Sequence, residues 1–157
     1  MARAFPSLLI ASLVAACGPG APPYLCEADS RCVEAAPGEV TAIDGDTFEF
    51  VRTLEDRDSR ATGRFRLRLI GWDSPESGAA AACPAEAALG LKVEARAKAL
   101  VAAAEEVVFL PVGNDEYGRF RVHLFLDRVH VGHLLRKEGL AAHWDEDAGA
   151  PKPDWCG

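Results

Sequence analysis

The sequence predicts a small, mainly β domain with helices, arranged as a five-stranded β-barrel. Three observations lead to this prediction. The length of 157 residues suits one domain. Five short runs have strand-like patterns, and helical patterns stand before the fourth run and after the last. Five strands with helices in these places match the OB-fold, a partly open barrel.

The first predicted strands lie at the start of the domain. Residues 39–43 and 47–51 are short strand-like runs joined by an Asp-Gly pair, which is a strong hairpin signal. Residues 52–63 form a charged connection without apolar periodicity. Residues 64–72 alternate basic and apolar side chains, as a half-buried strand does.

The strongest helical signal spans residues 84–106. This segment begins with a proline and is rich in alanine, leucine and glutamate. Gly90 lowers its helix propensity slightly. The pattern predicts three further elements: a strand (107–112), a hairpin (119–126 and 129–131) and a short helix that stops at a glycine (132–138).

The first 16 residues are typical of an export signal. A short positive start is followed by an apolar run that ends directly before Cys17. The sequence Leu-Val-Ala-Ala-Cys looks like a bacterial lipoprotein signal, in which the cysteine is lipidated; an ordinary secretory peptide is the alternative. No stretch reaches about 18 apolar residues, so no membrane-spanning helix is predicted.

We therefore expect three parts in the chain. Residues 1–16 form a signal peptide of lipoprotein type, residues 17–38 a Gly/Pro-rich tether, and residues 39–157 the folded domain with a C-terminal tail. The expected location is the cell envelope, on the periplasmic or extracellular face, with a lipid anchor that contacts the membrane.

The cysteine count agrees with export. Five cysteines are an odd number, but lipidation of Cys17 leaves four, which in an oxidising compartment predicts two disulfides. Of the three possible pairings we favour Cys26–Cys32 and Cys83–Cys156. The long loop would contribute about 4.4 kcal/mol in the chain-entropy model, and the short one about 2 kcal/mol. A four-cysteine zinc site is the alternative, but no C-x-x-C pair is present.

The formal net charge is −7, whereas proteins that bind nucleic acids are usually basic. An acidic surface lowers the rate of association with a polyanion, but it does not exclude a small basic cleft.

Three motifs place carboxylates and arginines where strands end or turn. Together they could hold a hard cation, activate a water molecule and bind a phosphate. In chain order they are Asp44-Gly45-Asp46-Thr47, then Arg68 followed by Asp73-Ser74-Pro75-Glu76, and last Tyr117-Gly118-Arg119.

These motifs, in this order, resemble the staphylococcal nuclease (thermonuclease) family, specifically an exported bacterial branch with extra cysteines. The resemblance spans about residues 39–142 and implies a staphylococcal-nuclease-like OB-fold. It also implies endonucleolytic hydrolysis of DNA and RNA with low sequence specificity, which leaves 3′-phosphates. The expected substrate is single-stranded or frayed, since an OB-fold surface suits unpaired strands. We expect a monomer.

The resemblance assigns one Ca²⁺ to Asp46, Asp73 and the backbone carbonyl of Ser74. Calcium prefers oxygen ligands, and two carboxylates give weak affinity, with a Kd on the order of 10⁻⁴–10⁻³ M. The family usually has threonine where this chain has Ser74, and a backbone ligand tolerates that change. Without the second motif, the Asp-Gly-Asp sequence would be read simply as a turn, and Asp44 is the expected turn residue.

The resemblance makes Glu76 the general base, which takes a proton from water. The resemblance also implies that Arg68 and Arg119 bind the phosphate, because a guanidinium can contact two oxygens at once. We expect Tyr117 to contact the sugar or base of the substrate. The alternatives are an exposed loop residue for Glu76 and a half-buried strand residue for Tyr117.

Two other interpretations remain open. One is an OB-fold module that binds nucleic acid or a partner without catalysis, and the other is an envelope lipoprotein with a structural role. The four histidines lack metal-ligand spacing and are expected at the surface or at strand edges: His123, His130, His133 and His143.

Overall fold

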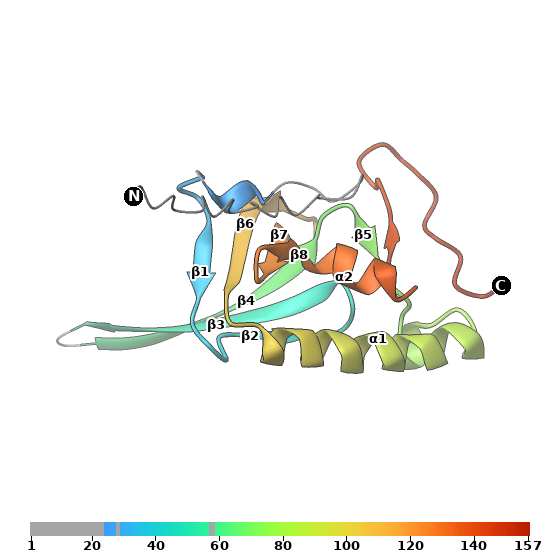
Figure 1. Ribbon diagram of the computed structural model, residues 1–157, viewed down its shortest axis with the longest axis horizontal. Coiled ribbons are helices and arrows are strands. Elements are labelled where there is room, and N and C mark those ends of the chain that lie inside the picture. The colour runs from blue at the N-terminus through green and yellow to red at the C-terminus, as the bar shows by residue number, and fades with distance from the viewer. Residues whose placement is uncertain (1–23, 28, 57–58) are drawn as a thin grey trace, which may run out of the picture.

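The computed structural model describes residues 24–27, 29–56 and 59–157 (Figure 1). The predicted signal peptide and Cys17 lie outside these residues. Within the described part, no helix has the length and apolar content needed to cross a membrane.

A mixed, curved sheet forms a half-barrel, which confirms the predicted OB-fold with helices. Its strands follow the order β1-β6-β7-β4-β3-β2, and β8 pairs with β7. The pair β4–β7 is parallel and the other pairs are antiparallel. The strands are β1 (Val33–Ala35), β2 (Val40–Ala42), β3 (Thr47–Asp56), β4 (Ser59–Leu69), β6 (Val107–Asn114), β7 (Phe120–Leu126) and β8 (Val129–His130).

Among the described residues, two α-helices and a small second sheet complete the domain. Helix α1 (Pro84–Ala103) runs along one side of the barrel, and α2 (Val131–Lys137) follows β8 directly (Figure 1). Strands β5 (Trp72–Asp73) and β9 (Ala142–His143) pair with each other. Short 3₁₀ helices are η1 (Leu25–Glu27) and η2 (Gly78–Ala80).

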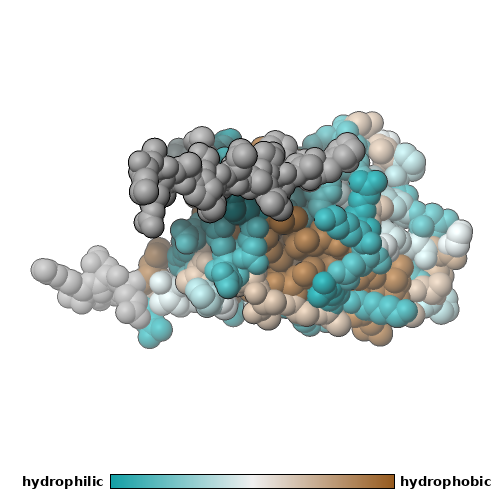
Figure 2. All heavy atoms as spheres, viewed as in Figure 1, coloured by the Kyte–Doolittle hydropathy of each residue, from teal (hydrophilic) through white to brown (hydrophobic). Residues whose placement is uncertain are grey.

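The hydrophobic core lies between the concave sheet and α1. The fully buried side chains include Phe48 of β3, Leu67 of β4 and Val93 of α1. Burying one such side chain contributes about 1.5–3 kcal/mol. Figure 2 shows hydrophobic residues gathered in the middle of the face viewed, with hydrophilic residues around them.

The predicted connection at residues 52–63 is wrong, because the structure continues both strands through it as a long β3–β4 hairpin (Figure 1). Cross-strand pairs explain the difference: the hydroxyls of Thr53 and Thr62 lie 3.0 Å apart, and Arg64 forms an ion pair with Glu49. Such pairs stabilise a two-stranded arm in which polar side chains mix with exposed apolar ones such as Leu54. A search for apolar alternation does not detect this kind of strand.

The predicted tether, residues 17–38, is too long at its C-terminal end. Residues Val33–Ala35 form β1, which pairs with β6 at the edge of the sheet, and Ala35 is buried. Three residues are too few to show a strand period. Both favoured disulfides are present, with Cα–Cα distances of 5.6 Å for Cys26–Cys32 and 6.0 Å for Cys83–Cys156. They are compatible with an exported protein.

Candidate active site

The turn between β2 and β3 presents the first carboxylate of the site. Asp44 Oδ1 accepts hydrogen bonds from the backbone N–H of Asp46 at 3.0 Å and of Thr47 at 2.6 Å, so Asp44 is the turn residue, as expected. A Cβ added at Gly45 would lie 2.6 Å from Ser74 Cβ. Glycine thus lets the turn pack against the loop after β5, where Asp46 is buried.

Three donors hold the Asp46 carboxylate. Arg68 Nη1 lies 2.6 Å from Oδ1, and the Thr47 hydroxyl donates to the same oxygen at 3.2 Å. The backbone N–H of Ser74 donates to Oδ2 at 2.9 Å. Asp46 and Arg68 are both buried. This carboxylate therefore joins β3, β4 and the loop after β5 in one fixed arrangement.

Asp73 is a fully buried carboxylate at the end of β5. Its Oδ2 accepts a hydrogen bond from Trp155 Nε1 at 2.7 Å, whereas its Oδ1 accepts none. Two cations lie near Oδ1: Lys152 Nζ at 3.3 Å and Arg68 Nη2 at 4.0 Å. Burial raises the pKa of Asp73, and the contacts with Trp155 and Lys152 oppose that rise.

Glu76 is positioned by the start of α1. Its backbone N–H donates to Glu86 Oε1 at 3.2 Å, and Glu86 Oε2 accepts from Ala82 N at 2.6 Å. Glu86 is buried, so it fixes the loop from within the protein. The Glu76 side chain is only partly exposed, and its Oε1 lies 3.2 Å from Lys152 Nζ.

Gly90 has a packing role that its sequence context does not show. A Cβ at this position would lie 2.2 Å from the backbone O of Glu76 and 2.7 Å from the backbone N of Ser77. The absence of a side chain therefore lets the Glu76 loop rest on α1. This contact accounts for a glycine in the middle of an otherwise strong helix.

We expect Gly90→Ala to destabilise the protein by about 1–3 kcal/mol, although alanine is the better helix former. The added methyl group meets backbone atoms, which cannot rotate away. Urea unfolding measures the change, and Leu91→Ala at an exposed neighbouring position is the control. An unchanged or higher free energy of unfolding for Gly90→Ala would contradict the packing role.

The two predicted arginines belong to neighbouring strands, since Arg68 lies on β4 and Arg119 directly precedes β7, but their ion-pair partners differ. Arg68 pairs in register with Arg121 across the parallel β4–β7 ladder, and Arg119 stands just before β7. Arg119 Nε lies 2.5 Å from Asp115 Oδ2, four residues earlier in the same turn. Among the described residues, no ion pair or hydrogen bond joins Arg119 to the Asp46 and Asp73 carboxylates.

Tyr117 lies in the turn between β6 and β7 and is 76% exposed. The alternative of a half-buried strand residue is therefore wrong. Its ring stands beside Arg119, with the guanidinium carbon 5.4 Å from the ring centroid. Asp115 Oδ1 shapes this turn by accepting hydrogen bonds from the backbone N–H groups of Tyr117 and Arg119. Tyr117 is free to meet a ligand at the surface.

The donor set suits a hard divalent cation. A cluster of three or more His, Cys, Asp or Glu side chains arranged to hold a metal does not occur within the described ranges. A calcium site made of two carboxylates, a backbone carbonyl and water molecules does not require three such side chains. Asp73 Oδ1 is buried and accepts no hydrogen bond from the described residues, and the groups that face it are the cations of Lys152 and Arg68. Burial and the neighbouring Asp46 raise the pKa of Asp44 to about 6, as expected where acidic groups gather.

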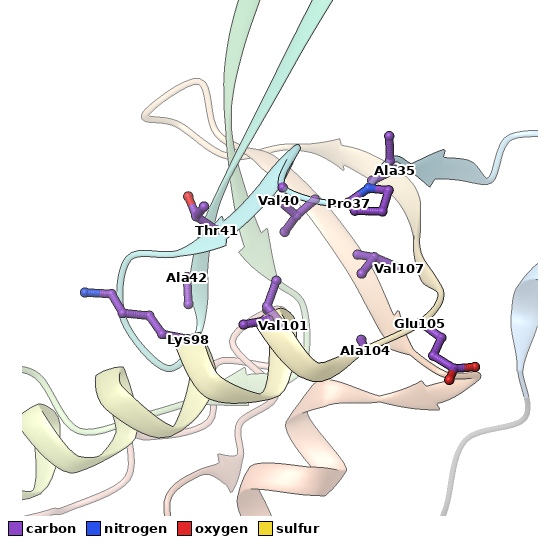
Figure 3. A pocket seen from close by; sticks show the side chains of 13 residues that line it. Ala35, Pro37, Val40, Thr41, Ala42, Lys98, Val101, Ala104, Glu105 and Val107 are labelled. Atoms are coloured by element: carbon purple, nitrogen blue, oxygen red, sulfur yellow. The ribbon is translucent and has the colours of Figure 1, made fainter.

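Two pockets differ in their relation to these residues. A pocket of about 160 Å³ is lined by Glu76, Glu86, Lys152 and Trp155, among others. A larger one of about 220 Å³ lies between the end of α1 and β2 (Figure 3). Val40, Val101 and Val107 line it, and none of the candidate site residues does. Of the candidate site residues, Glu76 alone lines the smaller pocket, together with the tail residues Lys152 and Trp155.

The expectation of surface or strand-edge positions holds only in part, because one histidine of the short strand β8 is buried. His130 is buried, and its Nδ1 accepts a hydrogen bond from Gly132 N at 3.1 Å as the cap of α2. Burial lowers the pKa of His130 to about 3, so its ring is neutral at pH 7. His123, His130 and His133 pack near Trp72 or one another as rings. They act as core and edge residues of this region.

Sequence reasoning did not assign three residues that contact the site. Lys152 and Trp155 come from the C-terminal tail, and Glu86 comes from α1. One signal could have found the tail residues. The favoured Cys83–Cys156 disulfide already placed the tail beside the start of α1, close to Glu76 in sequence.

The chain matches one known family, described as staphylococcal nuclease homologue, over residues 66–152. This range is more than half of the chain and includes the candidate residues from Arg68 to Arg119, but not Asp46. No curated protein shows a significant match. On the family match, together with the OB-fold half-barrel, the chain belongs to the staphylococcal nuclease homologue family.

Proposed function

We propose that this protein is a calcium-dependent nuclease that hydrolyses phosphodiester bonds of DNA and RNA with low sequence specificity. One observation carries the proposal: Asp46, Arg68 and Asp73 form a buried charged group beside Glu76. Burying charge is costly, so such groups tend to mark functional sites. The family match supports the same activity.

Asp46, Asp73 and the backbone carbonyl of Ser74 are the proposed ligands of one Ca²⁺. Asp73 Oδ1 is the best-placed donor, because it is buried and accepts no hydrogen bond. Arg68 and Thr47 hold Asp46, and Trp155 holds the second oxygen of Asp73. When bound, the ion supplies positive charge next to the phosphate and the attacking water.

Glu76 is the proposed general base. A water molecule attacks the phosphorus and its proton passes to the Glu76 carboxylate. The bond to the 5′-oxygen breaks, and this oxygen takes a proton from solvent and leaves as a 5′-hydroxyl, so that a 3′-phosphate remains; Glu76 then loses its proton to water. General base catalysis contributes about 10²–10⁴-fold. The hydrogen bond from the Glu76 backbone to Glu86 and the close packing on Gly90 fix the position of this loop.

Arg68 and Arg119 are the proposed phosphate ligands. Arg68 Nη1 is held by Asp46, while Nη2 is 4.0 Å from Asp73 and makes the weaker contact. Arg119 is partly exposed and pairs only locally with Asp115, so a phosphate can replace that partner at modest cost. The charge that develops on the phosphate oxygens is then shared between two guanidinium groups.

Single-stranded or frayed DNA or RNA is the proposed substrate. The net charge of −7 opposes binding of a long duplex, which depends on phosphate contacts along the backbone. The exposed ring of Tyr117 beside Arg119 offers a stacking surface for an unpaired base. We further propose an exported monomer with a lipid anchor on Cys17.

The test is hydrolysis of a fluorescent single-stranded oligonucleotide by the protein with its disulfides intact. Millimolar calcium is expected to give cleavage, a chelator is expected to abolish it, and added calcium is expected to restore it. A duplex of the same sequence serves as the comparison and is expected to be cut more slowly. Cleavage that ignores the chelator would exclude calcium dependence, and binding without cleavage would favour the non-catalytic module.

A further inference from the structure

The C-terminal tail lies across the candidate metal ligands. Lys152 Nζ is 3.3 Å from Asp73 Oδ1 and 3.2 Å from Glu76 Oε1, so one ammonium group contacts both carboxylates. Three residues later, Trp155 Nε1 donates to the other oxygen of Asp73 at 2.7 Å. The tail therefore takes up both oxygens of Asp73, by a hydrogen bond at one and a cation at the other.

This segment is fixed at both ends. At its start, β9 pairs with β5, and Asp73 itself stands opposite Ala142. At its end, Cys156 is bonded to Cys83, the N-cap residue of α1. Because both ends are tied beside the site, Lys152 has a high effective concentration there.

Lys152 is the nearer of the two cations beside Asp73 Oδ1, at 3.3 Å against 4.0 Å for Arg68 Nη2, and it also contacts Glu76. Asp73 is fully buried, and its Oδ1 accepts no hydrogen bond from the described residues. Arg68 forms its closer ion pair with Asp46, through Nη1. A lysine carries a compact charge on a flexible stem. Its side chain is 44% exposed, so it can swing out to water without breaking the tail contacts of Trp155.

We propose that Lys152 is a tethered internal cation that competes with the divalent ion for Asp73 and Glu76, so that the C-terminal tail sets the calcium requirement. This inference rests on the proposed calcium-dependent function. An ammonium 3.3 Å from Asp73 Oδ1 and a metal ion on the same oxygen would repel each other, so binding of calcium displaces Lys152.

The test measures calcium binding directly, by titration calorimetry at fixed ionic strength on the oxidised full chain. Lys152→Gln removes the charge from an exposed position. The matched control is Lys98→Gln on α1, an exposed lysine paired with Glu94 at 2.6 Å. Both variants change the net charge equally, so long-range attraction of calcium changes equally in both.

We expect Lys152→Gln to lower the calcium Kd about fivefold or more, which corresponds to the loss of one charge interaction near the surface. Lys98→Gln should leave the Kd close to that of the unmodified protein. An unchanged or higher Kd for Lys152→Gln, or an equal drop in both variants, would overturn the proposal. An unchanged Kd with a raised KM for the oligonucleotide would show that Lys152 binds phosphate instead, and would also overturn it.

Activity of the unmodified protein reports separately on the proposed function. If it cleaves the oligonucleotide with calcium and the two variants bind calcium alike, only the role of Lys152 fails. If it binds no calcium and does not cleave, the proposed function fails and the competition fails with it.

Discussion

Replacing Glu76 with glutamine is expected to reduce hydrolysis of single-stranded DNA by about 10²–10⁴-fold, the usual contribution of a general base. Glutamine keeps the size of the side chain but cannot take a proton from water. The fold should persist, because the hydrogen bond from Glu76 to Glu86 uses the backbone N–H, and the lost ion pair to Lys152 lies near the surface. The measurement is kcat/KM at saturating calcium.

Glu94→Gln is the matched control, since Glu94 is a carboxylate on α1 with its own lysine partner, Lys98. It makes the same change in net charge, and its activity should stay within about twofold of the unmodified protein. Hydrolysis by Glu76→Gln that falls less than about tenfold would rule out this residue as the base. Residual cleavage by Glu76→Gln, purified in the same way, sets the upper limit on cleavage by a contaminating nuclease.

Arg68→Lys is expected to lower kcat/KM by about 10²–10³-fold, which corresponds to about 2.7–4 kcal/mol of lost transition-state stabilisation. Lysine keeps the charge next to Asp46 but cannot contact two phosphate oxygens in one plane. Arg68→Ala would be a poorer test. It would leave the buried Asp46 carboxylate without its cation, at a cost of about 3–5 kcal/mol in stability.

Arg66→Lys provides the comparison on the same strand. Arg66 has the same side-chain parity as Arg68, but it is exposed and lies 3.9 Å from Glu49. We expect little effect on kcat/KM, since exposed pairs of this kind contribute at most about 1 kcal/mol. Equal losses for the two variants would mean that general positive charge, and not the buried guanidinium, supports the reaction. Thermal unfolding of each variant shows whether activity is lost with the fold.

The sequence predicted the fold, and it indicated that Asp46 and Asp73 stand where strands begin or end. Both predictions depend on local sequence patterns. Asp46 follows Asp44 and Gly45 in the turn before β3, as expected. Asp73 lies in β5, beyond a turn after Leu69, whereas the sequence predicted one strand over residues 64–72. The long β3–β4 hairpin was not predicted, because its stability comes from polar cross-strand pairs such as Thr53 with Thr62. Three-residue β1 was too short to recognise.

The tail contacts were missed for a different reason, although the favoured Cys83–Cys156 disulfide already placed the tail near α1. Lys152 and Trp155 reach Asp73 across about 80 residues of sequence, through a disulfide and the β5–β9 pair. No local pattern marks a lysine that lies over a distant carboxylate. The packing role of Gly90 could not be recognised from local sequence either, since it depends on contact with the Glu76 backbone and not on the helix that contains Gly90.

The parallel pairing of β4 with β7 also determines when the site can form during folding. Leu67, Arg68 and Leu69 meet their partners only after α1 and β6 have crossed from one strand to the other. Contacts of such long sequence separation form late and slowly, whereas α1 needs only local contacts. We therefore expect a refolding chain to regain helix content first, and Arg68 to meet its β7 partner Arg121 only when the barrel closes.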